Sequence, residues 1–162
     1  MEMTTLQERL DKLDELLNEY QTLHGLPLQC PKEIEIRGKE LLEMVPTQFK
    51  SLNREDCAEA ALTLSQFGFY IQQTINVETA RLHWCEENVR RIIAPLLPQQ
   101  TAYAYKERES TAMLGDDAAI KLDSLRVQVS FRIARMAYLA SKIEGVRQGF
   151  IELSQAKPRS GI

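Results

Sequence analysis

The sequence has few of the residues on which catalytic and metal sites depend. It holds two histidines and three scattered cysteines, with no Cys-x-x-Cys spacing and no glycine-rich phosphate loop. Neither His24 nor His83 belongs to a Glu-x-x-His pair, and His83 and Cys85 are two residues apart, on different faces of a helix. No serine lies in a Gly-x-Ser-x-Gly turn. We therefore expect no metal, no cofactor and no enzymatic activity.

Long apolar runs are also absent, since no stretch of 18 uncharged apolar residues occurs, and this predicts no membrane span. The first residues, Met-Glu-Met-Thr-Thr, lack the basic and apolar regions of a signal peptide. Seven glycines and six prolines are few for an all-β protein with many turns. The cysteines fit reduced thiols. The expected location is the cytoplasm, or the host cell cytoplasm if the protein is phage-encoded.

The sequence does contain a long series of small or apolar residues at alternating steps of four and three. The series is Cys57, Ala61, Leu64, Gly68, Ile71, Ile75, Glu78, Leu82, Cys85, Val89, Ile92 and Leu96. Only Glu78 in it is charged. No proline lies between Pro46 and Pro95, so one helix of about 60 Å can run through the series. The pattern predicts a long helix that packs against other helices.

A first helix is expected near the amino terminus. Thr5 and Glu8 fit a capping box, in which each side chain accepts a hydrogen bond from a backbone amide of the first turn. Helical spacing is kept by Leu6, Leu10, Leu13, Leu17 and Tyr20. Gly25 with Pro27 provides a stop. Such a short amphipathic helix is not stable alone in water. It must therefore pack on the rest of the chain or on another subunit.

The segment from Pro31 to Val45 has two readings. Ile34 and Ile36 alternate as in a strand, but the later apolar residues favour a short helix, with Pro31 close to its first turn. We favour the helix, which Pro46 ends. Asn53 and Asp56 then supply the amino-terminal cap of the long helix.

Pro95 and Pro98 end the long helix and turn the chain. A third major segment follows to about residue 156, and the sequence Gly-Asp-Asp at 115–117 can break or kink it. The β-branched cluster at 127–133 tolerates a strand, but the helical stripe continues through it, so helix is favoured. The expected core positions are Leu122, Leu125, Val129, Met136, Ile143, Val146, Phe150 and Leu153.

These patterns predict an all-α, elongated protein. Two long antiparallel helices, at about 53–95 and 100–156, form a helical hairpin. Residues 1–50 hold shorter helices for packing or oligomerisation, residues 51–156 form the hairpin, and residues 157–162 are a flexible tail. The apolar series and the leucine-rich first helix together predict a homo-oligomer.

Charge differs between the two halves of the chain. Residues 1–80 hold 7 Lys/Arg and 14 Asp/Glu, a net −7, whereas residues 81–162 hold 13 and 9, a net +4. In the last helix, Lys121, Arg132, Arg135 and Lys142 recur close to whole turns and form one row. A row of cations can follow a phosphate backbone. Ordinary solvated helix faces, paired with the acidic half, explain the same charges equally well.

Aromatic residues stand beside some of these cations. Trp84, the only tryptophan, lies near basic residues of the long helix, and Tyr103 and Tyr105 precede two more. Single-stranded nucleic acid is bound by base stacking as well as by charge, although packing within the core or a turn also accounts for such aromatics. The candidate nucleic-acid-binding residues are Arg81, Trp84, Arg90, Arg91, Lys106, Arg108, Lys121, Arg132, Arg135 and Lys142.

Short motifs in the second half resemble a known family. They are the run from Tyr105 to Leu114 (Tyr-Lys-Glu-Arg-Glu-Ser-Thr-Ala-Met-Leu), Asp116-Asp117, Lys121-Leu-Asp-Ser124 and Gly149-Phe150-Ile151. Together they resemble the carboxy-terminal half of the UvsY family, the recombination mediators of T4-like bacteriophages. The likeness covers about 50 residues. The family's basic box has a partial match in Thr79-Ala80-Arg81 or, alternatively, in Val89-Arg-Arg91. Pro95 and Pro98 stand in place of its glycine-rich turn.

The resemblance implies a small helical protein that assembles into a ring, binds single-stranded DNA and helps a recombinase displace single-strand-binding protein. The expected partners are therefore single-stranded DNA, a recombinase, single-strand-binding protein and further copies of this chain, with no membrane. A structural or adaptor protein of phage assembly, without a nucleic-acid role, is the alternative. A catalytic helical bundle would need converging polar side chains in its core, which the apolar series does not supply.

Overall fold

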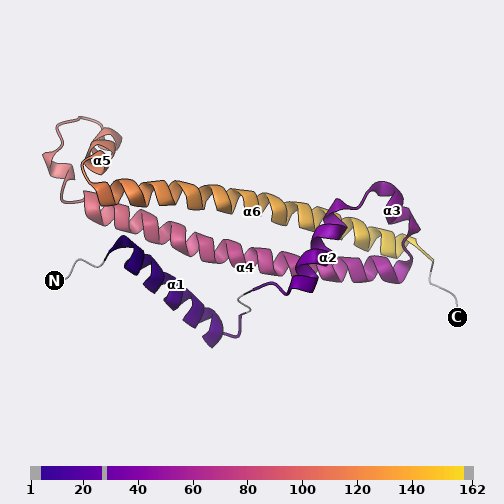
Figure 1. Cartoon of the computed structure of the whole chain (residues 1–162). Coiled ribbons are helices and arrows are strands. Elements are labelled where there is room, and N and C mark those ends of the chain that lie inside the picture. Colours follow the sequence, from indigo (N-terminus) through magenta and orange to yellow (C-terminus); the bar gives the residue numbers. More distant parts are fainter. Residues whose placement is uncertain (1–4, 27–28, 159–162) are drawn as a thin grey trace. The chain divides into compact units, whose positions relative to one another are not determined.

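The computed structural model describes residues 5–26 and 29–158. Its elements in chain order are α1 (Leu6–Leu23), α2 (Lys32–Glu43), α3 (Pro46–Ser51), α4 (Arg54–Ile93), the 3-10 turn η1 (Leu97–Gln99), α5 (Tyr105–Leu114) and α6 (Asp117–Ala156) (Figure 1). These ranges contain no strand, so the predicted all-α class is confirmed. None of the helices described is both long and apolar enough to cross a membrane.

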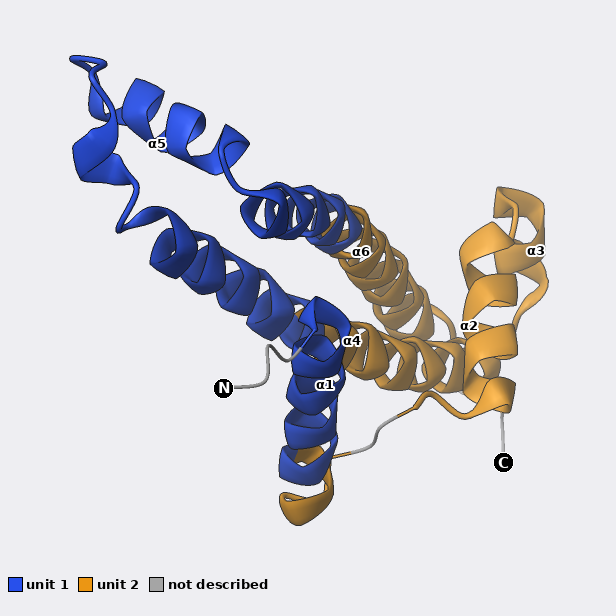
Figure 2. Ribbon diagram, turned by 60° about the vertical axis from the view of Figure 1, so that its left-hand side comes forward, with its two compact units in different colours: residues 1–20, 76–134 blue, residues 21–75, 135–162 orange. Residues whose placement is uncertain are grey.

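The chain forms two compact units (Figure 2). Unit 1 comprises residues 1–20 and 76–134, and unit 2 comprises residues 21–75 and 135–162. Unit 2 contains the first half of α4 and the second half of α6, and unit 1 contains the other half of each helix. Within each unit the two halves lie side by side and antiparallel, which confirms the predicted pairing of two long helices. The homo-oligomer stays a prediction.

Both ends of α1 follow the sequence signals. The Thr5 amide donates to the Glu8 carboxylate at 2.6 Å, and the Glu8 amide donates to the Thr5 hydroxyl at 3.2 Å, so the capping box is confirmed. At the other end Gly25 adopts φ +62°, a conformation that glycine tolerates best. The Leu26 amide returns to the Gln21 carbonyl at 2.8 Å and closes the helix. Pro27, the second part of the predicted stop, lies outside the described residues.

Residues 32–43 are helical, so the helix reading of this segment was correct. A further short helix, α3, was not predicted. Pro46 ends the preceding segment and also begins α3, because proline fits the first turn of a helix. The Gln48 side chain accepts a hydrogen bond from the Val45 amide at 2.9 Å and stabilises this start.

The long helix α4 matches its prediction closely. It begins after the reciprocal cap of Asn53 and Asp56, whose backbone-to-side-chain hydrogen bonds measure 3.1 and 2.7 Å. Every position of the four-three series is buried or half-buried, including Glu78, which is only 6% exposed. The series from Cys57 to Ile92 is therefore the packing face of α4, as predicted, and Leu96 follows just after the helix ends.

The segment predicted as a helix from about residue 100 to residue 156 is helical only from Tyr105 onward, and the break that the Gly-Asp-Asp sequence at 115–117 allowed is present. It is divided at Gly115 and Asp116 into α5 and α6. Asp116 ends the continuity because its carboxylate accepts hydrogen bonds from the amides of Ala118 and Ala119, both at 2.9 Å, and so caps a new helix. From Asp117 onward the helix is uninterrupted, and the helical reading of residues 127–133 is confirmed.

The core of unit 2 joins α2, α4 and the second half of α6. Phe49 and Phe150 stack with ring centroids 5.0 Å apart, and the Phe67 ring lies against Gly38. Lys157, the first residue of the predicted tail, donates from Nζ to the carbonyls of Phe49, Lys50 and Leu52. The amine thereby satisfies carbonyls at the end of α3. Residues 159–162 lie outside the described residues.

The core of unit 1 is smaller. Ile93, Ala112 and Ala119 form a buried cluster where α4, α5 and α6 meet. Fully buried side chains of α4 and α6 extend the packing, and these are Cys85, Leu122 and Val129. Two polar side chains share this interior, Glu78 and Asn88. Because buried polar groups are stable only with hydrogen-bond partners, their contacts define the candidate site.

Candidate nucleic-acid interface

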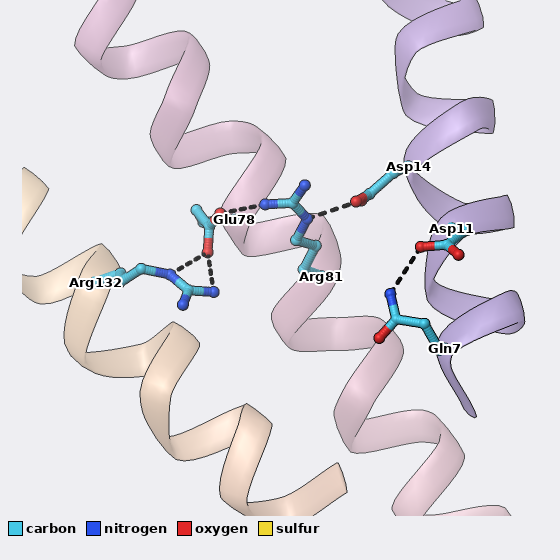
Figure 3. A network of polar contacts seen from close by, with 6 residues as sticks. All are labelled: Gln7, Asp11, Asp14, Glu78, Arg81 and Arg132. Carbon is cyan, nitrogen blue, oxygen red and sulfur yellow. Dashed lines mark hydrogen bonds and ion pairs between the residues drawn. The ribbon is translucent and has the colours of Figure 1, made fainter. Parts of the chain in front are cut away.

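Glu78 stands at the centre of a polar network in unit 1 (Figure 3). One of its carboxylate oxygens binds Arg81 of α4 at 2.5 Å, and the other binds Arg132 of α6 at 2.9 Å. Arg81 also donates to Asp14 of α1 at 2.9 Å. The network therefore links three helices through two arginines and two carboxylates.

The network fixes the charge of Arg81. Burial alone lowers the pKa of this guanidinium, but the hydrogen bonds and negative charges of Asp14 and Glu78 outweigh burial and raise the pKa above its usual value. Arg81 is therefore a fully charged but already paired cation. Arg132, which the sequence places in the basic row, is likewise paired with Glu78. Neither side chain is available to a phosphate without losing a carboxylate partner.

Trp84 is covered on one side by α1. The guanidinium carbon of Arg9 lies 5.7 Å from the centroid of the indole ring, within the range of a cation–π contact. Arg9 also donates to the side-chain oxygen of Asn88, and the Asn88 amide donates to the Trp84 carbonyl at 2.7 Å. These contacts satisfy the buried Asn88 and hold α1 against α4.

Arg90 and Arg91 share one carboxylate. Both pair with Glu87, at 3.3 and 3.1 Å, within one turn of α4. Each arginine side chain is 71% exposed, so these pairs are weak and solvated. Either guanidinium can exchange Glu87 for another anion at little energetic cost.

Lys106 and Arg108 belong to α5, and Lys106 lies beside Arg90 in one cavity. Arg108 is placed over the Tyr105 ring, 5.8 Å from its centroid, and its buried Nε has no hydrogen-bond partner among the described residues. Lys106 is exposed and lines a cavity of about 490 Å³. Three cations and three carboxylates line that cavity: Arg90, Lys106, Arg126, Glu86, Glu109 and Asp123. Such a balanced lining does not favour a polyanion.

Lys121, Arg135 and Lys142 of α6 are exposed and make no ion pair with any described residue. Lys121 belongs to unit 1, beside a cavity of about 690 Å³ that Arg9 also lines. Arg135 and Lys142 belong to unit 2, seven residues apart and about 10 Å along the helix axis. Of the four cations in the predicted row, Arg132 is therefore paired, whereas these three have no ion-pair partner within residues 5–26 and 29–158.

Sequence reasoning missed the α1 residues that cover α4. Arg9 and Asn88 are 79 residues apart, and Asp14 and Arg81 are 67 apart. No spacing pattern reports such pairs, because the pairing depends on how α1 packs. The exposed aromatics Phe131 and Tyr138 of α6 were also missed. Their seven-residue spacing was visible and indicated a second apolar row.

No group of three or more His, Cys, Asp or Glu side chains that could hold a metal ion occurs in the described ranges. Comparison of the chain with protein-family models, with curated proteins and with solved structures finds no match.

Proposed function

We propose that this chain is a non-enzymatic accessory protein of DNA recombination, which binds single-stranded DNA and helps to load a recombinase. The single observation that supports DNA binding is a set of exposed cations on α6 that pair with no carboxylate in the described part of the chain, namely Lys121, Arg135 and Lys142. An unpaired surface cation can neutralise a phosphate and release its counterions without first losing a carboxylate. The recombinase and single-strand-binding protein enter the proposal through the sequence resemblance.

A few cations per chain provide weak affinity. Several copies in a homo-oligomer would combine their rows, because each further contact on the same strand is intramolecular and gains from a high effective concentration. The proposal therefore includes self-association.

Fluorescence anisotropy with a labelled oligothymidine at about 50 mM salt tests DNA binding. Arg135→Glu/Lys142→Glu should weaken binding about tenfold or more, and affinity should fall with added salt. The matched control is Lys32→Glu/Lys50→Glu, which makes the same change in net charge on exposed lysines of α2 and α3. Equal losses in both variants, or binding indifferent to salt, would overturn the proposal.

A structural or adaptor role is the second candidate. Phe131 and Tyr138 of α6 are 68% and 76% exposed, and aromatic residues are enriched in protein–protein interfaces. Replacing both by serine should disrupt assembly under this reading, and neither the wild type nor the variant should bind DNA. Genome neighbourhood separates the candidates as well, since recombinase or helicase genes nearby support the first and capsid or tail genes support the second.

A further inference from the structure

Helix α1 places two groups on α4 that resemble parts of a nucleotide. The Asp14 carboxylate binds the Arg81 guanidinium at 2.9 Å, in the way that a phosphate oxygen binds arginine. The planar Arg9 guanidinium lies over the Trp84 indole at 5.7 Å, at the side of the ring where a base would stack. The two groups lie five residues apart on α1 and meet residues three apart on α4.

We propose that α1 is an intramolecular cover over a second nucleic-acid-binding face, formed by Arg81 and Trp84 of α4, and that single-stranded DNA displaces it. The inference rests on the proposed function. It explains why residues with the chemistry of a single-strand platform are occupied in this structure by a helix of net charge −3 (two cations and five carboxylates in Leu6–Leu23).

Helix α1 is packed less tightly than the helices of the core. Its leucines at the α4 side, Leu6, Leu10, Leu13 and Leu17, are only half-buried. Neither core cluster of the described chain includes an α1 residue. Leu122 and Val129 of α6, in contrast, are fully buried. Elements with few buried apolar contacts open most readily.

The face beneath α1 would retain part of its present pairing. Arg81 keeps its 2.5 Å contact with Glu78 when Asp14 leaves, so it stays oriented but gains room for one phosphate oxygen. Trp84 loses the Arg9 guanidinium and offers a ring to one base. The ligand class that fits is therefore a single strand, with at least one unstacked base next to a phosphate.

The chain offers a matched pair of variants for the test. Asp14→Asn weakens the contact with Arg81. Asp11→Asn makes the same charge change on α1, at a residue that accepts a hydrogen bond within the helix, from Gln7 at 2.8 Å (Figure 3). Trp84 is the only tryptophan, so its fluorescence reports on this face alone. The full-length protein is titrated with oligothymidine, by anisotropy and by tryptophan quenching.

Asp14→Asn should bind at least threefold more tightly than wild type and show stronger quenching of Trp84, and Asp11→Asn should match wild type in both. Trp84→Leu in the Asp14→Asn background should remove the gain.

Equal effects of the two α1 variants, or tighter binding without quenching, would overturn the cover. If Arg135→Glu/Lys142→Glu weakens DNA binding but Asp14→Asn leaves it unchanged, the cover is refuted and the proposed function still stands. Absence of binding in every variant would refute both.

Discussion

Glu78 and Arg132 lie 54 residues apart in the chain and meet at 2.9 Å, so that the only charge in the packing face of α4 is neutralised from α6. Arg81 approaches the same carboxylate from one turn further along α4. A buried charge without a partner is costly. The network therefore explains how a carboxylate is tolerated at a position where the series otherwise has apolar or small residues.

Removing Arg132 should cost more than removing Glu78. Arg132→Met leaves a nearly buried carboxylate with one partner fewer and should lower the free energy of unfolding by about 1 to 2 kcal/mol. Glu78→Leu should lie within about 1 kcal/mol of wild type, because Leu suits the packing face, Arg81 keeps its contact with Asp14, and Arg132 is exposed enough to be solvated by water. Urea unfolding measures both. If Glu78→Leu is the more destabilised variant, the carboxylate contributes net stability and this account is wrong.

Gly38 and Gly145 should respond oppositely to alanine. A Cβ at Gly38 would approach the Phe67 ring to 2.6 Å, and Phe67 is buried and cannot move away, so Gly38→Ala should cost about 1 to 3 kcal/mol. A Cβ at Gly145 meets nothing within 4 Å on an exposed turn of α6, and Gly145→Ala should stabilise by about 0.5 to 1 kcal/mol. Thermal unfolding followed by circular dichroism distinguishes them. A stabilised Gly38→Ala variant would mean that α2 does not pack this closely on α4.

Stability should decline at alkaline pH because of Cys85. Burial raises the pKa of its thiol, Arg126 and Arg132 partly oppose this, and Glu86 adds to it. The folded state thus binds its proton more tightly than the unfolded state. The contribution of Cys85 to the free energy of unfolding is fully present below the ordinary thiol pKa of about 8.5. This contribution is lost as the pH rises through the pKa of the thiol in the folded state.

Urea unfolding near pH 7.5 and 9.5 measures this dependence, and Cys85→Ala should reduce it. Labelling with a thiol-reactive dye provides an independent check. Half-buried Cys30 should react in the folded protein, whereas buried Cys57 and Cys85 should react only on unfolding. Rapid labelling of all three thiols at neutral pH would contradict the burial of the packing face.

Lys157 should stabilise α3. Its Nζ contacts the carbonyls of Phe49 and Lys50 at 3.3 Å each, and Leu52 as well, so Lys157→Met should cost about 0.5 to 1.5 kcal/mol. Amide hydrogen exchange in α3 should accelerate in this variant. Lys50→Met removes an exposed lysine from α3 itself and serves as the control, with a change within about 0.5 kcal/mol. Similar exchange rates in both variants would refute the anchoring role.

Local signals in the sequence determined much of this protein. The reciprocal caps at Thr5–Glu8 and Asn53–Asp56, the stop at Gly25, and the packing face from Cys57 to Ile92 all appear in the structure as expected. Each depends on residues within one or two turns of each other, and helical geometry fixes such relationships without tertiary contacts. The Gly-Asp-Asp sequence at 115–117 indicated a break or a kink, and the Asp116 side chain, which caps two backbone amides, makes it a break.

Only the tertiary structure decided which charged residues are available to a ligand. From spacing alone, Arg132 is equivalent to Arg135 and Lys142, yet Glu78 pairs with Arg132 and leaves the other two exposed. Likewise, nothing near Arg81 or Trp84 in the chain indicates that Asp14 and Arg9 of α1 cover them. Helical periodicity determines which face a side chain occupies, but the packing of distant segments determines what meets it there.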